Sequence, residues 1–352
     1  MITYRAGIDI GSTTVKLVLL DENGKILFGQ YRRHCAHTQQ TLRQLLAEAR
    51  EQVGSCLLQV KITGSGSINL GKAMGIGFVQ EVVAVASALQ AVAPQTDVAI
   101  ELGGEDAKII YFRGGLEERM NGVCAGGTGS FIDQMASLLQ TDAAGLNAQA
   151  EHYQEIYPIA ARCGVFAKTD IQPLINEGAT TADLAASIFQ AVVNQTIAGL
   201  AQGRKIAGKV IFLGGPLSFC MGLRRRFVET LKLDEQHAVF PDYARFSVSY
   251  GAALYASHQK QTYTFDGFCK LLKATRSTGT GVGTEPPLFA DNDELEAFLV
   301  RHTRADVKRT DIATYTGKAY LGIDCGSTTT KLTLTDENDG LLYSYYDSNK
   351  GN

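Results

Sequence analysis

The chain has 352 residues, of which 45 % are hydrophobic, and its formal net charge is −3 at pH 7. This length can hold two domains of ordinary size. The near-neutral net charge does not indicate binding to nucleic acid or to an anionic membrane. The longest apolar stretches, such as residues 82–89, are too short to span a bilayer, and the first residues lack a signal-peptide pattern, so we expect a cytoplasmic protein.

The N-terminal segment predicts a β-hairpin whose turn can bind phosphate. Two β-rich runs flank the sequence Gly-Ser-Thr-Thr, in which glycine permits close approach of a ligand and the next three residues offer amides and hydroxyls. The candidate phosphate contacts are Gly11, Ser12, Thr13, Thr14 and Lys16. Asp9 lies at the end of a buried strand, which is costly unless the carboxylate holds a metal ion or its water shell. A plain polar hairpin is the alternative for this segment taken alone.

Strands and helices then alternate in the manner of a sheet covered by helices. We expect helices over residues 38–52, 79–92 and 249–256, and strands over residues 26–31, 57–63, 97–102, 108–112 and 209–213. Two of these strands run into glycine turns, at Gly103-Gly104-Glu105-Asp106 and at Gly214-Gly215. Glu101 lies just before the first of these turns, so the order of strand, acidic residue and glycine turn occurs twice.

The seven cysteines are scattered without CxxC spacing, which indicates neither a disulfide framework nor an intrachain zinc site. Two of them, Cys124 and Cys163, each lie among small residues before a segment with apolar residues at helical spacing. At a helix N-terminus the free amides and the helix dipole stabilise a thiolate, which is the form that binds metals. The alternative is that both are small buried residues, the commonest fate of a free cysteine.

Three strand-to-glycine-turn units in this order resemble the superfamily of acetate and sugar kinases, Hsp70 and actin. In that superfamily two phosphate loops and a later adenosine loop surround ATP in a cleft between two related lobes. The resemblance implies an α/β fold of two ribonuclease-H-like lobes with mixed sheets. It places residues 9–16 in the first phosphate loop, residues 101–106 in the second, and Gly214 with Gly215 in the adenosine loop.

The two cysteine segments, Cys-Ala-Gly-Gly-Thr-Gly-Ser-Phe and Cys-Gly-Val-Phe-Ala-Lys-Thr-Asp, are similar to those of the activators of 2-hydroxyacyl-CoA dehydratases, a group that includes benzoyl-CoA reductase ATPases. This resemblance implies an ATPase coupled to electron transfer. Each subunit of a homodimer would give two cysteines, here Cys124 and Cys163, to one shared [4Fe-4S] cluster. It also implies Mg²⁺-ATP, ferredoxin or flavodoxin as the electron donor, and an iron–sulfur dehydratase or reductase as the recipient.

The same resemblance gives the catalytic positions to Asp9, Glu101, Glu105 and Asp106. The family usually has Asp where this chain has Glu101 and Gln where it has Glu105, so metal geometry and water activation can differ here. Two other classes from the superfamily stay open: a small-molecule kinase, and a chaperone-like or filament-forming ATPase. Neither of these has a use for the cysteine pair.

Residues 322–338 repeat residues 7–23 with identity at all but four positions. Because a hairpin and a half cannot form a nucleotide domain, we interpret the end of the chain as the truncated start of a second ATPase module. The expected organisation is a first lobe at residues 1–96 plus 245–258, a second lobe with the cluster-binding helices at 97–244, a linker region with a short helix at 259–318, and the module start at 319–352.

Overall fold

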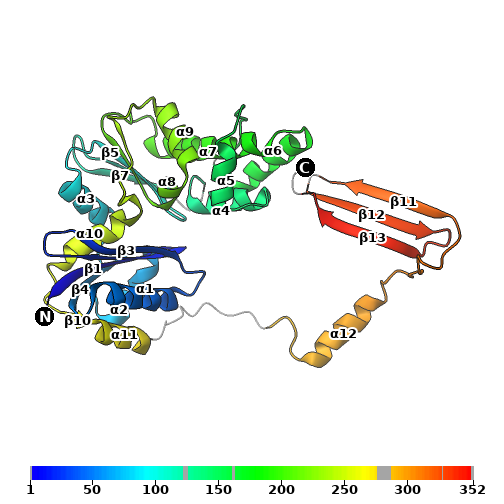
Figure 1. Ribbon diagram of the computed structural model, residues 1–352, viewed down its shortest axis with the longest axis horizontal. Coiled ribbons are helices and arrows are strands. Elements are labelled where there is room, and N and C mark those ends of the chain that lie inside the picture. Colours follow the sequence, from blue (N-terminus) through cyan, green and yellow to red (C-terminus); the bar gives the residue numbers. More distant parts are fainter. Residues whose placement is uncertain (1, 122–125, 161–162, 276–286, 327, 350–352) are drawn as a thin grey trace. The chain divides into compact units, whose positions relative to one another are not determined.

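The computed structural model describes residues 2–121, 126–160, 163–275, 287–326 and 328–349 (Figure 1). The chain forms two units, the first made of residues 1–171 and 179–277, and the second of residues 172–178 and 278–352. Two five-stranded sheets with their covering helices make up the first unit, and a separate three-stranded sheet belongs to the second.

The first sheet has the order β10-β4-β1-β2-β3, in which β1 and β4 are parallel and the other neighbours are antiparallel. Its strands are β1 (Thr3–Ile10), β2 (Thr14–Leu20), β3 (Ile26–Arg33), β4 (Leu57–Thr63) and β10 (Tyr263–Thr264). Side chains alternate between the two faces of the hairpin, so Ile8 and Leu17 point to the same face. There they pack in one core with Leu42 and Leu45 of helix α1 (Thr38–Val53). The short helix α2 (Ile68–Met74) follows β4 and adds Met74 to this core.

Strand β10 and helix α11 (Phe265–Ala274) belong to the first sheet, so the prediction of a linker over these residues is wrong. β10 pairs with β4, and the side chain of Thr264 caps α11 by accepting a 3.0 Å hydrogen bond from the Gly267 amide. Phe265, Phe268 and Leu272 are buried in the same core as α1. Their spacing is helical, but the strand before them has only two residues and carries no periodic signal of its own.

The second sheet has the order β7-β6-β5-β8-β9 and repeats the plan of the first, with an antiparallel three-stranded run and a fourth strand, β8, parallel to β5. Its strands are β5 (Val98–Leu102), β6 (Ala107–Tyr111), β7 (Glu117–Met120), β8 (Val210–Leu213) and β9 (Ala238–Val239). The helices of this lobe are α4 (Gly129–Leu138), α5 (Ala143–Ala150), α6 (Gly164–Asn176), α7 (Thr181–Thr196), α8 (Gly215–Phe219) and α9 (Met221–Leu231).

Two further helices lie between the sheets (Figure 1), namely α3 (Glu81–Val92) and α10 (Ser247–Ala256). α10 packs on β1 and on α3. A Cβ atom at Gly7 would lie 1.8 Å from the carbonyl oxygen of Ser249, and one at Gly251 would lie 1.8 Å from that of Ala84. Both glycines therefore permit backbone-to-backbone packing, and the small-residue helix expected from the sequence does pack tightly.

Helix α7 continues into one π-helical turn, Ile197–Ala201. By length and composition alone the combined stretch could cross a membrane, and it is the one helix in the described part of the chain that passes this test. The sequence predicts no membrane-spanning helix, because its longest apolar stretches, such as residues 82–89, are too short. Buried side chains such as Leu184, Ile188 and Val192 identify α7 as a core helix of the second lobe.

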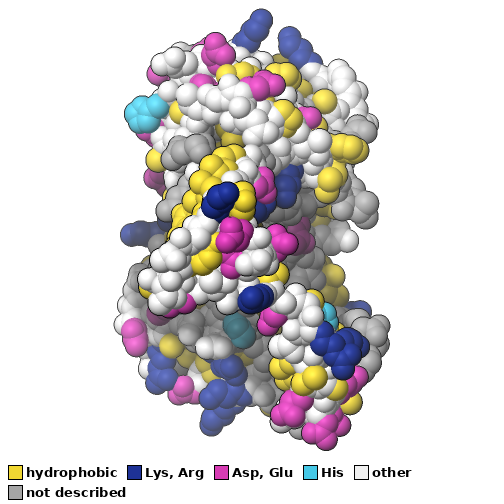
Figure 2. All heavy atoms as spheres, turned by 90° about the vertical axis from the view of Figure 1, so that its right-hand side faces the viewer, with side chains coloured by type: hydrophobic (Ala, Val, Ile, Leu, Met, Phe, Trp, Pro, Cys, Tyr) yellow, Lys and Arg dark blue, Asp and Glu magenta, His cyan; other side chains and the backbone are white. Residues whose placement is uncertain are grey.

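In the second unit, helix α12 (Asn292–Thr303) is followed by the antiparallel strands β11 (Ala319–Cys325), β12 (Thr329–Asp336) and β13 (Leu341–Ser348). Hydrophobic side chains of this sheet are open to solvent (Figure 2), among them Leu321, Ile323 and Tyr343. The hairpin predicted from the internal repeat is therefore formed, but its apolar residues are not buried.

Candidate nucleotide site

A cavity of about 470 Å³ opens between the two predicted phosphate loops. It is lined from the first loop by Asp9, Gly11, Ser12, Thr13, Thr14 and Lys16, and from the second by Glu101, Gly103, Gly104, Glu105 and Asp106. Every residue proposed from these two loops therefore faces one cavity. Its volume is in the usual range for pockets that enclose small ligands.

The first loop is a tight turn between β1 and β2. The Gly11 amide donates to the Thr14 carbonyl at 3.0 Å, and below the turn Lys16 Nζ lies 2.6 Å from Asp9 Oδ2. Burial disfavours the charged form of Lys16, but the adjacent Asp9 carboxylate outweighs it and raises the lysine pKa. Lys16 thus remains positively charged at the wall of the cavity, where it can bind a phosphate group.

The second loop closes in a similar way, with the Gly103 amide donating to the Asp106 carbonyl at 2.7 Å. Lys108 Nζ lies 2.6 Å from Asp106 Oδ2 and also pairs with Glu81 at the start of α3. Burial works against the charged form of Asp106, but the Lys108 charge prevails and lowers the aspartate pKa. The two loops approach each other closely at Gly104, where a Cβ atom would lie 2.3 Å from Thr13 Oγ1.

Glu101 has the most unusual environment of the acidic residues in this cavity. It is 5 % exposed, and its Oε2 atom has no hydrogen-bond partner among the described residues. Burial raises the pKa of Glu101 to about 7, although the nearby Lys108 charge works in the opposite direction. A buried carboxylate oxygen without a partner is a free ligand position for a cation that enters the cavity.

The donor atoms fit Mg²⁺ if the ion keeps water and takes phosphate oxygens. Carboxylates such as Asp9 and Glu101 are the hard oxygen ligands that Mg²⁺ prefers. No cluster of three or more His, Cys, Asp or Glu side chains that could hold a metal ion occurs within the described residues. A site with only one or two protein carboxylates is usual for Mg²⁺ bound with a nucleotide.

A second, smaller cavity of about 110 Å³ shares Thr13 and Gly104 with the first. Tyr31, Phe219 and Gly215 contribute to its wall. Gly214 has a positive φ of 92°, and a Cβ atom there would lie 2.0 Å from the carbonyl oxygen of Leu102, so this glycine serves close packing against β5. Of the two residues of the predicted adenosine loop, Gly215 lines this cavity and Gly214 packs against β5.

Of the two cysteines singled out by sequence, Cys163 lies at the start of α6, where its carbonyl accepts a 3.0 Å hydrogen bond from the Ala167 amide. It is half-buried and unbonded to other cysteines. Cys124 lies outside the described residues, five positions before α4 begins. The helix-start context is therefore present for Cys163, and α4 follows the Cys124 segment as expected.

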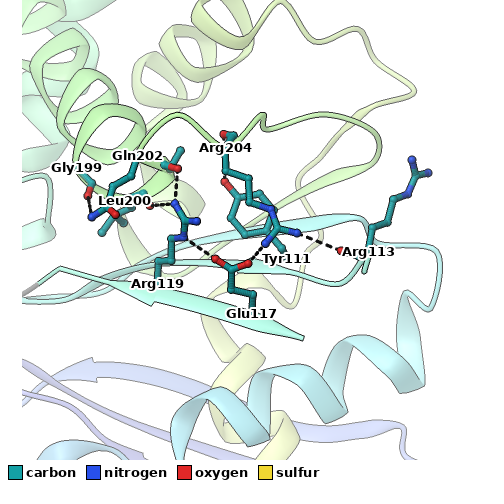
Figure 3. Close-up of polar contacts among 9 residues, drawn as sticks. Tyr111, Arg113, Glu117, Arg119, Gly199, Leu200, Gln202 and Arg204 are labelled. Carbon is teal, nitrogen blue, oxygen red and sulfur yellow. Dashed lines mark hydrogen bonds and ion pairs between the residues drawn. The ribbon is translucent and has the colours of Figure 1, made fainter. Parts of the chain in front are cut away.

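The edge strand β7, which leads toward the Cys124 segment, is held by a cluster of charged side chains (Figure 3). Arg119 donates from Nη1 to the carbonyls of Leu200 and Ala201 and from Nε to Glu117 Oε1 at 2.7 Å. Arg204 pairs with the same glutamate and stacks over the Tyr111 ring, 4.0 Å from its centroid. These contacts fix β7 against the C-terminal end of the α7 region.

Sequence reasoning missed several residues that line the main cavity, including Glu81, Lys108 and Glu118. Glu118 sits on β7, and burial raises its pKa. The paired registers of β5, β6 and β7 bring Lys108 and Glu118 to the loops, and Glu81 reaches the cavity from the start of α3, where it pairs with Lys108. Lys108 is the single charged residue of the otherwise apolar strand β6, and this was the signal available in the sequence.

The chain is similar in sequence and fold to known proteins. The 2-hydroxyisocaproyl-CoA dehydratase activator of Clostridioides difficile is 28 % identical over 262 residues, which cover 72 % of this chain and 94 % of the relative. Component A of (R)-2-hydroxyglutaryl-CoA dehydratase from Acidaminococcus fermentans superposes with a TM-score of 0.63 at 27 % identity, over 72 % of this chain and 97 % of that structure. The C. difficile activator with bound ADPNP superposes with a TM-score of 0.61 at 26 % identity, over 78 % of this chain and 98 % of that structure.

These likenesses confirm the expected two-lobed fold of the actin and Hsp70 type. The profile of the BadF/BadG/BcrA/BcrD ATPase family matches residues 6–256, which include both phosphate loops and both cysteine segments. The chain therefore belongs to the BadF/BadG/BcrA/BcrD ATPase family.

Proposed function

We propose that this protein is an ATP-dependent activator that delivers an electron to a 2-hydroxyacyl-CoA dehydratase or a benzoyl-CoA reductase component. The observation that carries this proposal is the larger cavity, which residues of both phosphate loops line in a chain of this family. Relatives named as dehydratase activators, and a relative from Thauera aromatica named as part of benzoyl-CoA reductase, support the choice of recipient.

Mg²⁺-ATP would lie between the loops with its phosphates near Thr13, Lys16 and Gly104. The loop amides and Lys16 would bind phosphate oxygens, while Asp9 and Glu101 would hold the ion through its water shell. Glu105 and Asp106 lie at the same wall, where they can position the water that attacks the terminal phosphate. The unpartnered oxygen of Glu101 supports this placement of the ion.

The cluster site would be completed by symmetry. A [4Fe-4S] cluster requires four thiolates, and one chain contributes Cys163 together with Cys124. A two-fold dimer supplies the second pair, and the start of α6 would direct its amides and dipole toward the anionic cluster. When bound, such a cluster supplies one-electron transfer, with ferredoxin or flavodoxin as the donor in the cytoplasm. The kinase alternative leaves the cysteine at the start of α6 without a role.

The test is an anaerobic assay in which this protein, reduced by a ferredoxin or flavodoxin, is mixed with a dehydratase partner and ATP. We expect dehydratase activity that requires ATP hydrolysis and that ADPNP does not support. ADP release that depends instead on a sugar or carboxylic acid, with no iron in the protein, would favour the kinase.

A further inference from the structure

We propose that helix α4 couples the nucleotide cavity to the start of α6, and that Arg33 and Asp133 are the positioning residues of this coupling. The inference rests on the proposed function, since it names how the nucleotide state would reach the helices next to the cysteines. Three separate contacts of α4 carry it: one with the second phosphate loop, one with the first lobe, and one with α6.

The first contact joins α4 to the second phosphate loop. The amides of Gly129 and Ser130 donate to the carbonyls of Gly103 and Gly104, at 2.9 and 2.7 Å. The first amides of a helix have no partner within the helix, so the loop carbonyls act as its cap. A shift of the loop around a bound phosphate therefore displaces the N-terminus of α4.

The second contact crosses from the first lobe to the second. Arg33 of β3 forms a bidentate ion pair with Asp133 of α4, with Nη1–Oδ2 at 2.8 Å and Nη2–Oδ1 at 3.0 Å. Both residues line the smaller cavity together with Thr13 and Gly104, where the two loops meet. The arginine side chain is 58 % exposed, so the pair adds little to stability, but its planar geometry fixes orientation.

The third contact is made by Gln134 and Met135, the two residues that follow Asp133 in α4. A Cβ atom at Gly164 would lie 2.8 Å from Gln134 Oε1 and 3.9 Å from Met135 Cε. Gly164 directly follows Cys163 and opens α6. The start of α6 therefore meets α4 at the side-chain ends of Gln134 and Met135, and a movement of α4 reaches Gly164 through these two side chains.

A nucleotide bound between Thr13 and Gly104 changes how far the loops can separate, and Arg33 and Asp133 span the same opening. The state of the cleft that binds the nucleotide better is the state that its binding favours. With the ion pair in place, α4 follows the first lobe through this change; without it, α4 is tied only to its own loop. The ion pair therefore decides how much of the lobe movement reaches Gly164.

The chain has no tryptophan, so a Ser137→Trp reporter on the exposed side of α4 gives a single emission signal. We expect Mg²⁺-ADPNP to change this emission, and Arg33→Glu or Asp133→Arg to reduce the change about fivefold, at the lower end of typical coupling between sites. The double reversal, Arg33→Glu with Asp133→Arg, restores the pair and should regain most of the response.

The matched control lies one position earlier on β3. Arg32 makes an equally bidentate pair with Glu48 of α1, at 2.8 and 2.9 Å, entirely within the first lobe. Arg32→Glu removes a pair of the same geometry that does not reach α4, so it should keep the full emission response. Calorimetry of ADPNP binding accompanies each variant.

Wild-type protein that does not bind ADPNP would overturn the proposed function and this coupling with it. Binding without any emission change in the reporter protein would overturn the coupling alone. So would single reversals that keep the full response, a double reversal that regains none of it, or an Arg32→Glu variant that loses as much as Arg33→Glu.

Discussion

Two hairpins in this chain have nearly the same sequence and opposite surroundings. β1 with β2 and β11 with β12 share the same register, and in each the lysine lies 2.6 Å from the aspartate of the partner strand. The turn hydrogen bonds also match, at 3.0 Å from Gly11 and 2.9 Å from Gly326. The local geometry of a phosphate loop is therefore determined by the hairpin itself.

Burial separates the two hairpins. Ile8 is 1 % exposed and Ile323 is 61 % exposed, although they are equivalent positions of the repeat. The first hairpin is covered by α1 and α10, whereas the four differences in the repeat include Thr330, Thr333 and Thr335 in place of Val15, Val18 and Leu20. What makes the first loop a site is thus its packing and the second loop opposite it, and both are absent from the described surroundings of the copy.

The largest difference is expected in stability. Ile8→Ala removes side-chain atoms from a filled core and should lower the free energy of unfolding of the first unit by roughly 2–5 kcal/mol. Ile323→Ala, in solvent, should change the stability by less than about 0.5 kcal/mol. Urea unfolding of both variants gives the two values, and similar losses at the two positions would break the comparison.

The next difference concerns hydrolysis. Asp9→Asn should reduce ATP turnover by roughly 10- to 100-fold, because in the proposed site this carboxylate would hold the water shell of the ion. Nucleotide binding should suffer far less. Asp324→Asn changes the equivalent residue of the copy and should leave turnover as it is. Steady-state ATPase assays compare the two, and equal losses would show that the copy takes part in hydrolysis.

Glu101 belongs to the second loop, which has no equivalent beside the C-terminal copy in the described part of the chain. The pH dependence of Mg²⁺ binding therefore tests a feature that only the first hairpin's surroundings provide. Burial raises the pKa of this carboxyl to about 7, so it is mostly neutral below that pH and mostly ionised above it. Since one proton competes with Mg²⁺, the apparent Mg²⁺ affinity should fall about tenfold for each pH unit below 7. Glu101→Gln should remove this slope. A Mg²⁺ titration at several pH values measures it, and an unchanged slope in the variant would assign the proton to another group.

The smallest effect is expected from removal of the copy. A chain that ends at residue 277 keeps both lobes with β10 and α11, so its ATP turnover and melting temperature should match those of the full chain. A chain that ends at residue 258 loses Phe265, Phe268 and Leu272 from the core and should melt earlier. Equal behaviour of the two truncations would contradict the assignment of α11 to the first sheet.

The features that were predictable from the sequence are local ones. The hairpins, the glycine turns and the amphipathic helices depend on residues a few positions apart, and the structure confirms them. Arg33 and Asp133 are 100 residues apart, and Lys108 meets Glu81 across 27 residues. Such pairs form only when the lobes come together, and no periodic pattern in the sequence predicts which residues will pair. The resemblance to a family supplied the fold that brings them close.

The shared cluster is the central claim, and iron analysis of anaerobically reconstituted protein tests it most directly. We predict about four irons and four sulfides per two chains, because four thiolates hold one four-iron cluster. Cys163→Ser and Cys124→Ser should each remove two ligands at once, so that neither variant dimer retains the cluster. Cys220→Ser, at a buried cysteine between α8 and α9, should retain it. Wild-type protein that takes up no iron, or that holds a full cluster as a monomer, would contradict the account.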